Sequence, residues 1–67
     1  SQLQEYLQSH GSIYPVYRTV SSQGPDHDPI FTIHVLSDQR LLGIGQGKKK
    51  SDAERAAARD ALQKIGI

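Results

Sequence analysis

The spacing of apolar side chains predicts a helix near each end of the chain. In residues 2–10 the apolar positions follow the i, i+3, i+4 rule of a short helix, and Gly11 is its predicted end. Residues 51–66 repeat alanine and leucine at helical spacing over about four turns, and Gly66 is the predicted stop. Both helices carry one apolar face and therefore need a surface to pack against.

The segment between the helices is predicted to contain three strands. Residues 16–20 follow a proline and are rich in β-branched and aromatic side chains, residues 30–36 alternate apolar with polar side chains, and residues 41–45 form a short apolar run. An antiparallel sheet with one apolar face needs cover, which here must come from the helices. The sequence therefore predicts an α+β fold of order α-β-β-β-α, with both helices packed on one face of a three-stranded antiparallel sheet.

Turn-forming residues separate the predicted strands. Residues 37–40 are typical of a turn, and residues 21–29 hold two prolines, one glycine and two aspartates, which predicts a nine-residue loop. The centre of this loop, residues 24–27, is stiffened by proline, so we expect a shaped turn that presents His27 to a partner. A metal site is disfavoured, because neither a second histidine at ligand spacing nor an EF-hand pattern accompanies His27.

Length and composition limit the classes of function. With 67 residues the chain is expected to form one small domain, residues 1–67, and to be a piece of a longer protein because it begins without methionine. So short a chain leaves little room for a substrate pocket. The lack of cysteine excludes disulfides and thiolate zinc sites and fits an intracellular, cytoplasmic setting, and no apolar run is long enough for a membrane span.

The net charge of +1 does not by itself indicate a nucleic-acid ligand, but the positive charge is local. Three lysines are consecutive at 48–50, directly after the glycines of the sequence GIGQG. A nucleotide-binding loop is excluded, because Leu42 stands where the first glycine of a phosphate loop should be and Lys49 where Ser or Thr should bind magnesium. The lysines instead precede a helix N-terminus, which favours an anion.

Two details of this segment stay open from the sequence. The N-cap of the second helix is either Ser51, with Glu54 in capping-box spacing, or Lys49, with Asp52 at the third position. The alternating glycines 43 and 45 either allow the helix to pack closely on the third strand or contact phosphate directly.

Several short motifs, in order along nearly the whole chain, resemble a double-stranded RNA-binding domain, most of all the C-terminal domain of ribonuclease III. The matching stretches are Leu3-Gln4-Glu5, Pro15-x-Tyr17, Gly24-Pro25-x-His27, Phe31-x-Ile33-x-Val35, Gly43-x-Gly45-x-Gly47, and Lys50 followed by Ala53-Glu54 and Ala56-Ala57-Ala58. Each motif alone is weak, and together they are specific.

The resemblance implies three contacts with A-form RNA. The first helix enters a minor groove, the loop around residues 25–27 reaches the next minor groove, and the lysines bridge phosphates across the intervening major groove. The RNA-binding residues expected on this basis are Ser1, Gln4, Glu5, Gln8, Pro25, Asp26, His27, Lys48, Lys49, Lys50 and Ser51. The expected partner is double-stranded RNA without preference for DNA.

The resemblance also bears on catalysis. The acidic residues are scattered without a magnesium-binding motif, so we expect no catalytic residue, no metal ligand and no cofactor in this chain, with magnesium serving only a nuclease domain elsewhere in a ribonuclease III-type parent. A weak homodimer or a contact with such a nuclease domain is compatible with the pattern.

The sequence departs from the family at the lysine cluster. Many members carry lysine where this chain has Ser51 and Glu54, so that Lys50 alone is in register, with Lys48 and Lys49 as compensating candidates. The near-neutral charge keeps one alternative open: a domain of the same fold that binds protein partners or dimerises without binding RNA.

Overall fold

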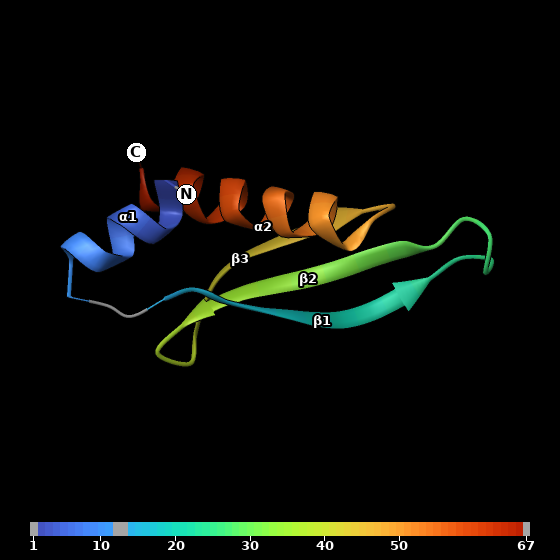
Figure 1. Ribbon diagram of the computed structural model, residues 1–67, viewed down its shortest axis with the longest axis horizontal. Helices are drawn as coiled ribbons and strands as arrows, with labels where there is room; N and C mark the ends of the chain where they lie inside the picture. The colour runs from blue at the N-terminus through green and yellow to red at the C-terminus, as the bar shows by residue number, and fades with distance from the viewer. Residues whose placement is uncertain (1, 12–13, 67) are drawn as a thin grey trace.

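The computed structural model describes residues 2–11 and 14–66. The elements, in chain order, are α1 (Gln2–Ser9), β1 (Val16–Gln23), β2 (Ile30–Ser37), β3 (Arg40–Gly47) and α2 (Lys50–Ile65). The three strands form one antiparallel sheet in the order β1-β2-β3, and both helices lie on the same face of it (Figure 1). The predicted α-β-β-β-α fold is confirmed.

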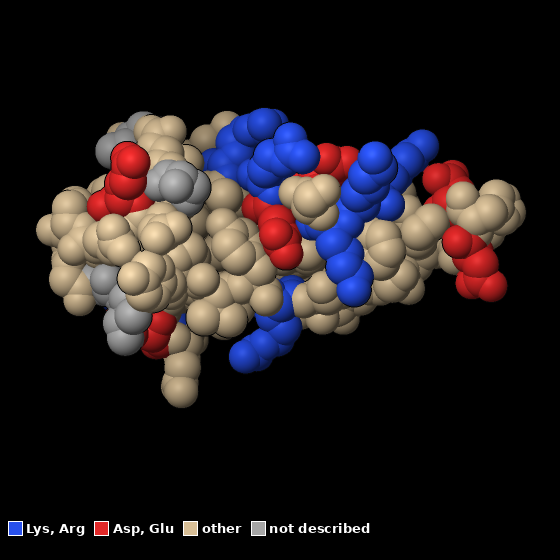
Figure 2. Space-filling view, viewed as in Figure 1, with Lys and Arg blue, Asp and Glu red and all other residues tan. Residues whose placement is uncertain are grey.

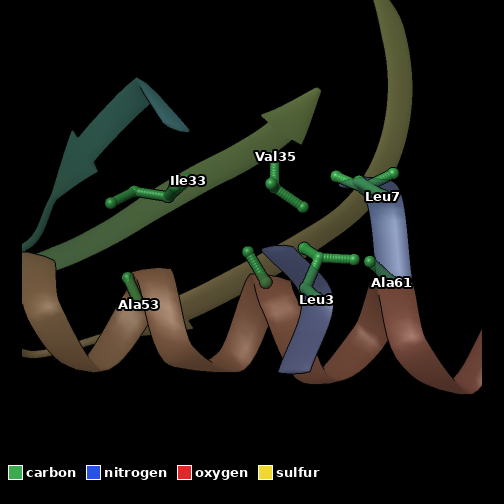
Figure 3. Close-up of a cluster of buried hydrophobic side chains, with 7 residues drawn as sticks. Leu3, Leu7, Ile33, Val35, Ala53 and Ala61 are labelled. Carbon is green, nitrogen blue, oxygen red and sulfur yellow. The ribbon is translucent and has the colours of Figure 1, made fainter. Parts of the chain in front are cut away.

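The core lies between this face of the sheet and the two helices. Leu3 and Leu7 of α1 point toward Ile33 and Val35 of β2 and toward the alanines of α2 (Figure 3). The fully buried positions of α2 are Ala53, Ala57 and Ala61. Their small side chains bring the axis of α2 close to the sheet.

The glycines of β3 complete this close approach. A Cβ atom at Gly43 would lie 2.5 Å from the carbonyl oxygen of Ala57, and one at Gly45 would overlap the backbone of α2 at Ala53 and Ala57. A Cβ at Gly47 would lie 2.8 Å from the backbone nitrogen of Ala53. Of the two alternatives for these glycines, close packing is therefore confirmed.

The first strand is longer than predicted, and the loop after it is shorter. β1 continues to Gln23, so residues 24–29 connect it to β2, six residues in place of the predicted nine. The strand register shifts between Thr19 and Ser21, which marks a bulge, and pairing then resumes. The polar residues 21–23 belong to an exposed edge strand, where polar side chains face solvent, and this is why they resembled a loop.

The second hairpin is tighter than predicted. Ser37 pairs with Arg40, so only Asp38 and Gln39 connect β2 to β3, with φ values of 52° and 66°. Positive φ at both central residues is typical of the two-residue turn that suits the twist of antiparallel strands. β3 consequently begins at Arg40 and extends to Gly47, beyond the predicted 41–45.

Candidate nucleic-acid interface

The lysine run leads directly into the first turn of α2. Lys49 is the N-cap residue, with φ −122° and ψ 150°, and its carbonyl oxygen accepts the backbone N–H of Ala53 at 3.0 Å. The alternative N-cap, Ser51, is wrong, because Ser51 already lies inside the helix. The side chain of Lys49 makes no capping hydrogen bond in this structure. The N-terminus of α2 thus keeps its preference for an anion and carries lysines instead of a capping oxygen.

Two of the three lysines contact the neighbouring β1–β2 region. The Nζ of Lys48 lies 3.7 Å from Oδ1 of Asp28, and both side chains are largely exposed. The Nζ of Lys50 lies 5.8 Å from the ring centroid of Phe31, a cation–π distance. Lys49 is exposed between them. These contacts place the lysine run beside the start of β2 and the end of the preceding loop.

The β1–β2 loop forms a defined turn. The backbone N–H of Asp28 donates to the carbonyl oxygen of Pro25 at 2.9 Å. Gly24 has φ +94°, and a Cβ there would lie 2.8 Å from the carbonyl oxygen of Asp28. The turn exposes Pro25, Asp26 and His27 to solvent. Within the described residues no cluster of histidine and acidic side chains is suited to a metal ion.

The polar face of α1 lies opposite its buried leucines. Glu5 and Gln8 are exposed, and Gln4 is partly exposed. Ser1, the fourth residue predicted for this surface, lies outside the described residues. At the end of the helix the rings of Tyr6 and His10 stack with centroids 4.1 Å apart, and the hydroxyl of Ser9 donates to the carbonyl oxygen of Tyr6 at 2.8 Å. These contacts stabilise the last turn of a helix of only eight residues.

The three predicted surfaces are distributed along the longest dimension of an elongated molecule. The principal extents are 41 × 20 × 16 Å. α1 lies at one end, the β1–β2 loop at the other, and the N-terminus of α2 lies on the loop side of the middle (Figure 1). The structure thus brings the lysine run together with the β1–β2 loop and keeps α1 apart from both.

Charge is unevenly distributed over the surface that carries α2 and the β1–β2 loop. Figure 2 shows Lys and Arg side chains gathered over α2 and the segment before it, with acidic side chains beyond them at the loop end. Sequence reasoning missed two of these cations, Arg55 and Arg59, which are exposed one helical turn apart. Their i, i+4 spacing after Ser51 was a signal that could have found them. Arg55 pairs with Asp52 at 3.3 Å.

The candidate interface is an open surface. The described part of the chain encloses no pocket. No helix in residues 2–11 or 14–66 is both long and apolar enough to span a bilayer.

Comparison with known proteins gives consistent sequence matches. A family model described as "Double-stranded RNA binding motif" matches residues 1–65. Ribonuclease 3 of Magnetococcus marinus is 43% identical over 61 residues, which cover 91% of this chain and 25% of that protein. Ribonuclease 3 of Bartonella henselae is 45% identical over 67 residues, which cover 100% of this chain and 28% of that protein. The chain therefore spans about a quarter of the length of these curated relatives.

Solved structures agree with the family match. A structure of Arabidopsis HYL1, described for its implications for miRNA processing, has a TM-score of 0.82 at 32% identity and covers 98% of this chain and 93% of that chain. A solution structure of both double-stranded RNA-binding domains of DRB4 has a TM-score of 0.74 at 37% identity, covering 96% of this chain and 41% of that chain.

Proposed function

Because this chain belongs to the double-stranded RNA binding motif family, we propose that it binds double-stranded RNA from outside, by the shape of the A-form helix and through the three surfaces described above. Double-stranded RNA offers a wide, shallow minor groove lined with 2′-hydroxyls and a deep, narrow major groove bordered by phosphates. An open surface about as long as the molecule suits such a ligand better than a pocket would.

The two ends of the molecule are suited to the minor grooves. Gln4, Glu5 and Gln8 on α1 present amide and carboxylate groups, which donate to or accept from hydroxyls and base edges. Ser1 belongs to the same proposed surface. At the other end, the turn holding Pro25, Asp26 and His27 presents polar atoms with little positive charge. Contacts with 2′-hydroxyls would distinguish RNA from DNA, which lacks them.

The lysine run is suited to the phosphates. Lys48, Lys49 and Lys50 are exposed, and Ser51 adds a hydroxyl in the first helical turn. The observation that carries the proposal is their position: they lie at the N-terminus of α2, where the N-cap side chain makes no capping hydrogen bond, between α1 and the β1–β2 loop. Backbone N–H groups and ammonium groups then act on the same phosphates.

The relatives suggest the context in which this domain works. The chain matches about a quarter of the length of relatives that are named ribonuclease 3, and the family model that it matches describes a binding motif. We infer that the chain is the substrate-binding part of an intracellular, ribonuclease III-type RNA-processing hydrolase, and is itself non-catalytic. Magnesium would serve the nuclease part of such a parent.

The first experiment compares labelled duplexes of about 20 base pairs, one of RNA and one of DNA, by fluorescence anisotropy at several salt concentrations. We expect salt-dependent binding to RNA and much weaker binding to DNA. Absence of binding to both would favour the alternative interaction module, and sedimentation would then show whether the chain dimerises. Incubation of the RNA duplex with magnesium is expected to give no cleavage.

Substitutions separate the two kinds of contact. Lys50→Ala should weaken binding to every RNA duplex and lower the slope of log affinity against log salt by about 1, because one phosphate contact is lost. Gln4→Ala should weaken binding with little change in slope, because a hydroxyl contact releases no counterion. Arg18→Ala is the matched control, since it removes the same charge at a different place. Arg18 lies opposite His34 in the register of β1 and β2, on the face of the sheet that the helices do not cover. An unchanged slope for Lys50→Ala would remove Lys50 from the site.

A further inference from the structure

The outer edge of β3 is a free strand edge. β3 is the last strand in the sheet order β1-β2-β3, so only one of its two edges pairs with another strand. An unpaired edge exposes N–H and C=O groups on which a strand of another chain can pair. Two large apolar side chains of the same strand are also exposed, Leu41 to 50% and Ile44 to 41%.

A carboxylate of α2 occupies this edge at its middle. The backbone N–H of Ile44 donates to Oδ2 of Asp60 at 2.9 Å. In an antiparallel strand a residue directs its N–H and its C=O to the same side, so Ile44 directs both away from β2. The same Oδ2 lies 2.9 Å from Nζ of Lys64, one turn further along α2.

The geometry follows from the close packing of α2 on β3. The glycines at 43 and 45 let the helix backbone lie near enough to the strand for a short aspartate side chain to reach its edge. The hydrogen bond from Ile44, and then the one from Lys64, lower the pKa of Asp60, so the carboxylate stays charged at neutral pH.

We propose that Asp60 closes the edge of β3 against strand pairing with a second copy of this chain. An antiparallel pair around Ile44 would be a two-fold contact in which each Ile44 N–H donates to the other Ile44 carbonyl. Asp60 already occupies that donor. A two-fold contact would also bring two Asp60 carboxylates close together, and their repulsion opposes it. The exposed Leu41 and Ile44 supply the apolar area that such a pair would bury once Asp60 is removed.

The proposal concerns self-association and does not rest on RNA binding. Asp60 contacts the outer edge of β3, whereas the proposed RNA surfaces lie on α1, the β1–β2 loop and the start of α2.

Sedimentation velocity over a range of concentrations tests the proposal on the chain and three variants. We expect the chain to be monomeric and Asp60→Ala to form dimers at least about tenfold more readily. Asp52→Ala is the matched control: it removes the same charge from α2 at a side chain that pairs with Arg55, and it should stay monomeric. Asp60→Asn keeps an oxygen acceptor without the charge, so it should dimerise more weakly than Asp60→Ala.

Amide hydrogen exchange locates the effect. In dilute wild-type protein the Ile44 amide should be protected by its bond to Asp60, and in Asp60→Ala it should be protected only at concentrations where dimers form. A folded Asp60→Ala that stays monomeric at millimolar concentration would overturn the proposal, as would a wild-type dimer that pairs through β3. If Asp60→Ala does not fold, Asp60→Leu carries the same test, because it removes the acceptor and the charge while keeping a side chain of similar size. Diluted to monomers, the Asp60 variants should bind RNA as the unaltered chain does, so a failure of RNA binding remains a separate result.

Discussion

At the scale of single residues, the fold depends on missing side-chain volume as much as on apolar side chains. Glycines at alternate positions of β3 face alanines at helical spacing on α2, and a Cβ at either Gly43 or Gly45 would meet helix backbone atoms. Backbone atoms of a helix cannot rotate away as a side-chain end does. We therefore expect these positions to tolerate nothing larger than glycine.

Gly45→Ala tests this packing. The added methyl group would overlap the backbone of Ala53 and Ala57, so α2 must move off the sheet, and we expect a loss of about 3 kcal/mol or more in the free energy of unfolding. Urea unfolding followed by circular dichroism measures it. Gly11→Ala is the control: its Cβ would meet no atom within 4 Å, and the cost is that of alanine at φ +79°, about 1 kcal/mol. Equal losses at both positions would contradict the packing argument.

Tyr17 is expected to make stability sensitive to alkaline pH. Partial burial, and secondly the charge of Glu54, raise the pKa of the Tyr17 hydroxyl above its ordinary value. A pKa higher in the folded than in the unfolded state favours the neutral form in the fold. This contribution is complete below the unfolded pKa of about 10 and is lost as pH rises through the folded pKa.

Tyr17→Phe should remove the part of the stability loss at alkaline pH that comes from ionisation of Tyr17. The measurement is the urea midpoint between about pH 8 and about pH 11 for the chain, Tyr17→Phe and Tyr14→Phe. Tyr14 is 59% exposed, so its variant should lose stability with pH as the unaltered chain does. Identical profiles for all three proteins would exclude Tyr17 as the cause.

Sequence reasoning at this scale succeeded where a residue has one physical explanation and failed where two compete. The buried Ile33 and Val35 followed directly from alternation. The N-cap did not, because Ser51 and Glu54 have capping-box spacing while the chain enters the helix at Lys49. The bond from Ile44 to Asp60 joins residues sixteen positions apart and requires the packed helix, so no local pattern could predict it.

At the scale of elements, α1 depends on its partners more than the others do. It has eight residues, and a helix so short is not stable alone in water. Leu3 and Leu7 fix it to the core, with exposed fractions of 0% and 5%. The surface that we propose for the minor groove is thus held in place mainly by these two leucines, with Tyr6 packed beside them.

Leu3→Ala should release α1 before it unfolds the sheet. Loss of this buried side chain costs about 2–5 kcal/mol in packing, and much of that falls on the contact between α1 and α2. Amide exchange of residues 4–9 should accelerate more than that of β2, and RNA affinity should fall. Uniform acceleration across the whole chain would show instead that α1 and the sheet unfold as one unit.

The observed bounds of the elements also show where the apolar periodicity and the residue composition of a segment predict different structures. All five were predicted in the right order, and the helices were placed within two residues of their ends. β1 was cut short because a bulge interrupts its alternation and because polar side chains suit its exposed side. A prediction from apolar–polar alternation therefore ends the strand at the bulge, although strand pairing continues beyond it.

At the scale of the whole molecule, the separation of the proposed surfaces should set the length of duplex required. The long dimension is 41 Å, with α1 and the β1–β2 loop at opposite ends. Domains of this family span about 16 base pairs, contacting two successive minor grooves. A shorter duplex cannot reach both ends at once.

Affinity should therefore fall steeply as the duplex is shortened from about 20 to about 8 base pairs. The fall should be larger than expected from the smaller number of positions at which the domain can bind along a shorter duplex. Anisotropy with RNA duplexes of graded length measures it. For the shortest duplexes we expect His27→Ala to have no further effect, because the loop is then unoccupied. A gradual decline with length would contradict the three-surface arrangement.

The ion pair between Lys48 and Asp28 has a consequence for motion. In the free protein it joins the β1–β2 loop to the start of α2 across a 3.7 Å gap between exposed groups. If Lys48 contacts a phosphate as we propose, that phosphate competes with Asp28 for the Lys48 ammonium, and binding would exchange one partner for another. The loop would then be released at the moment when the lysines are immobilised, and could adjust to the width of the groove it enters. Binding would thus fix the lysine run and, at the same time, free the β1–β2 loop from its contact with Lys48.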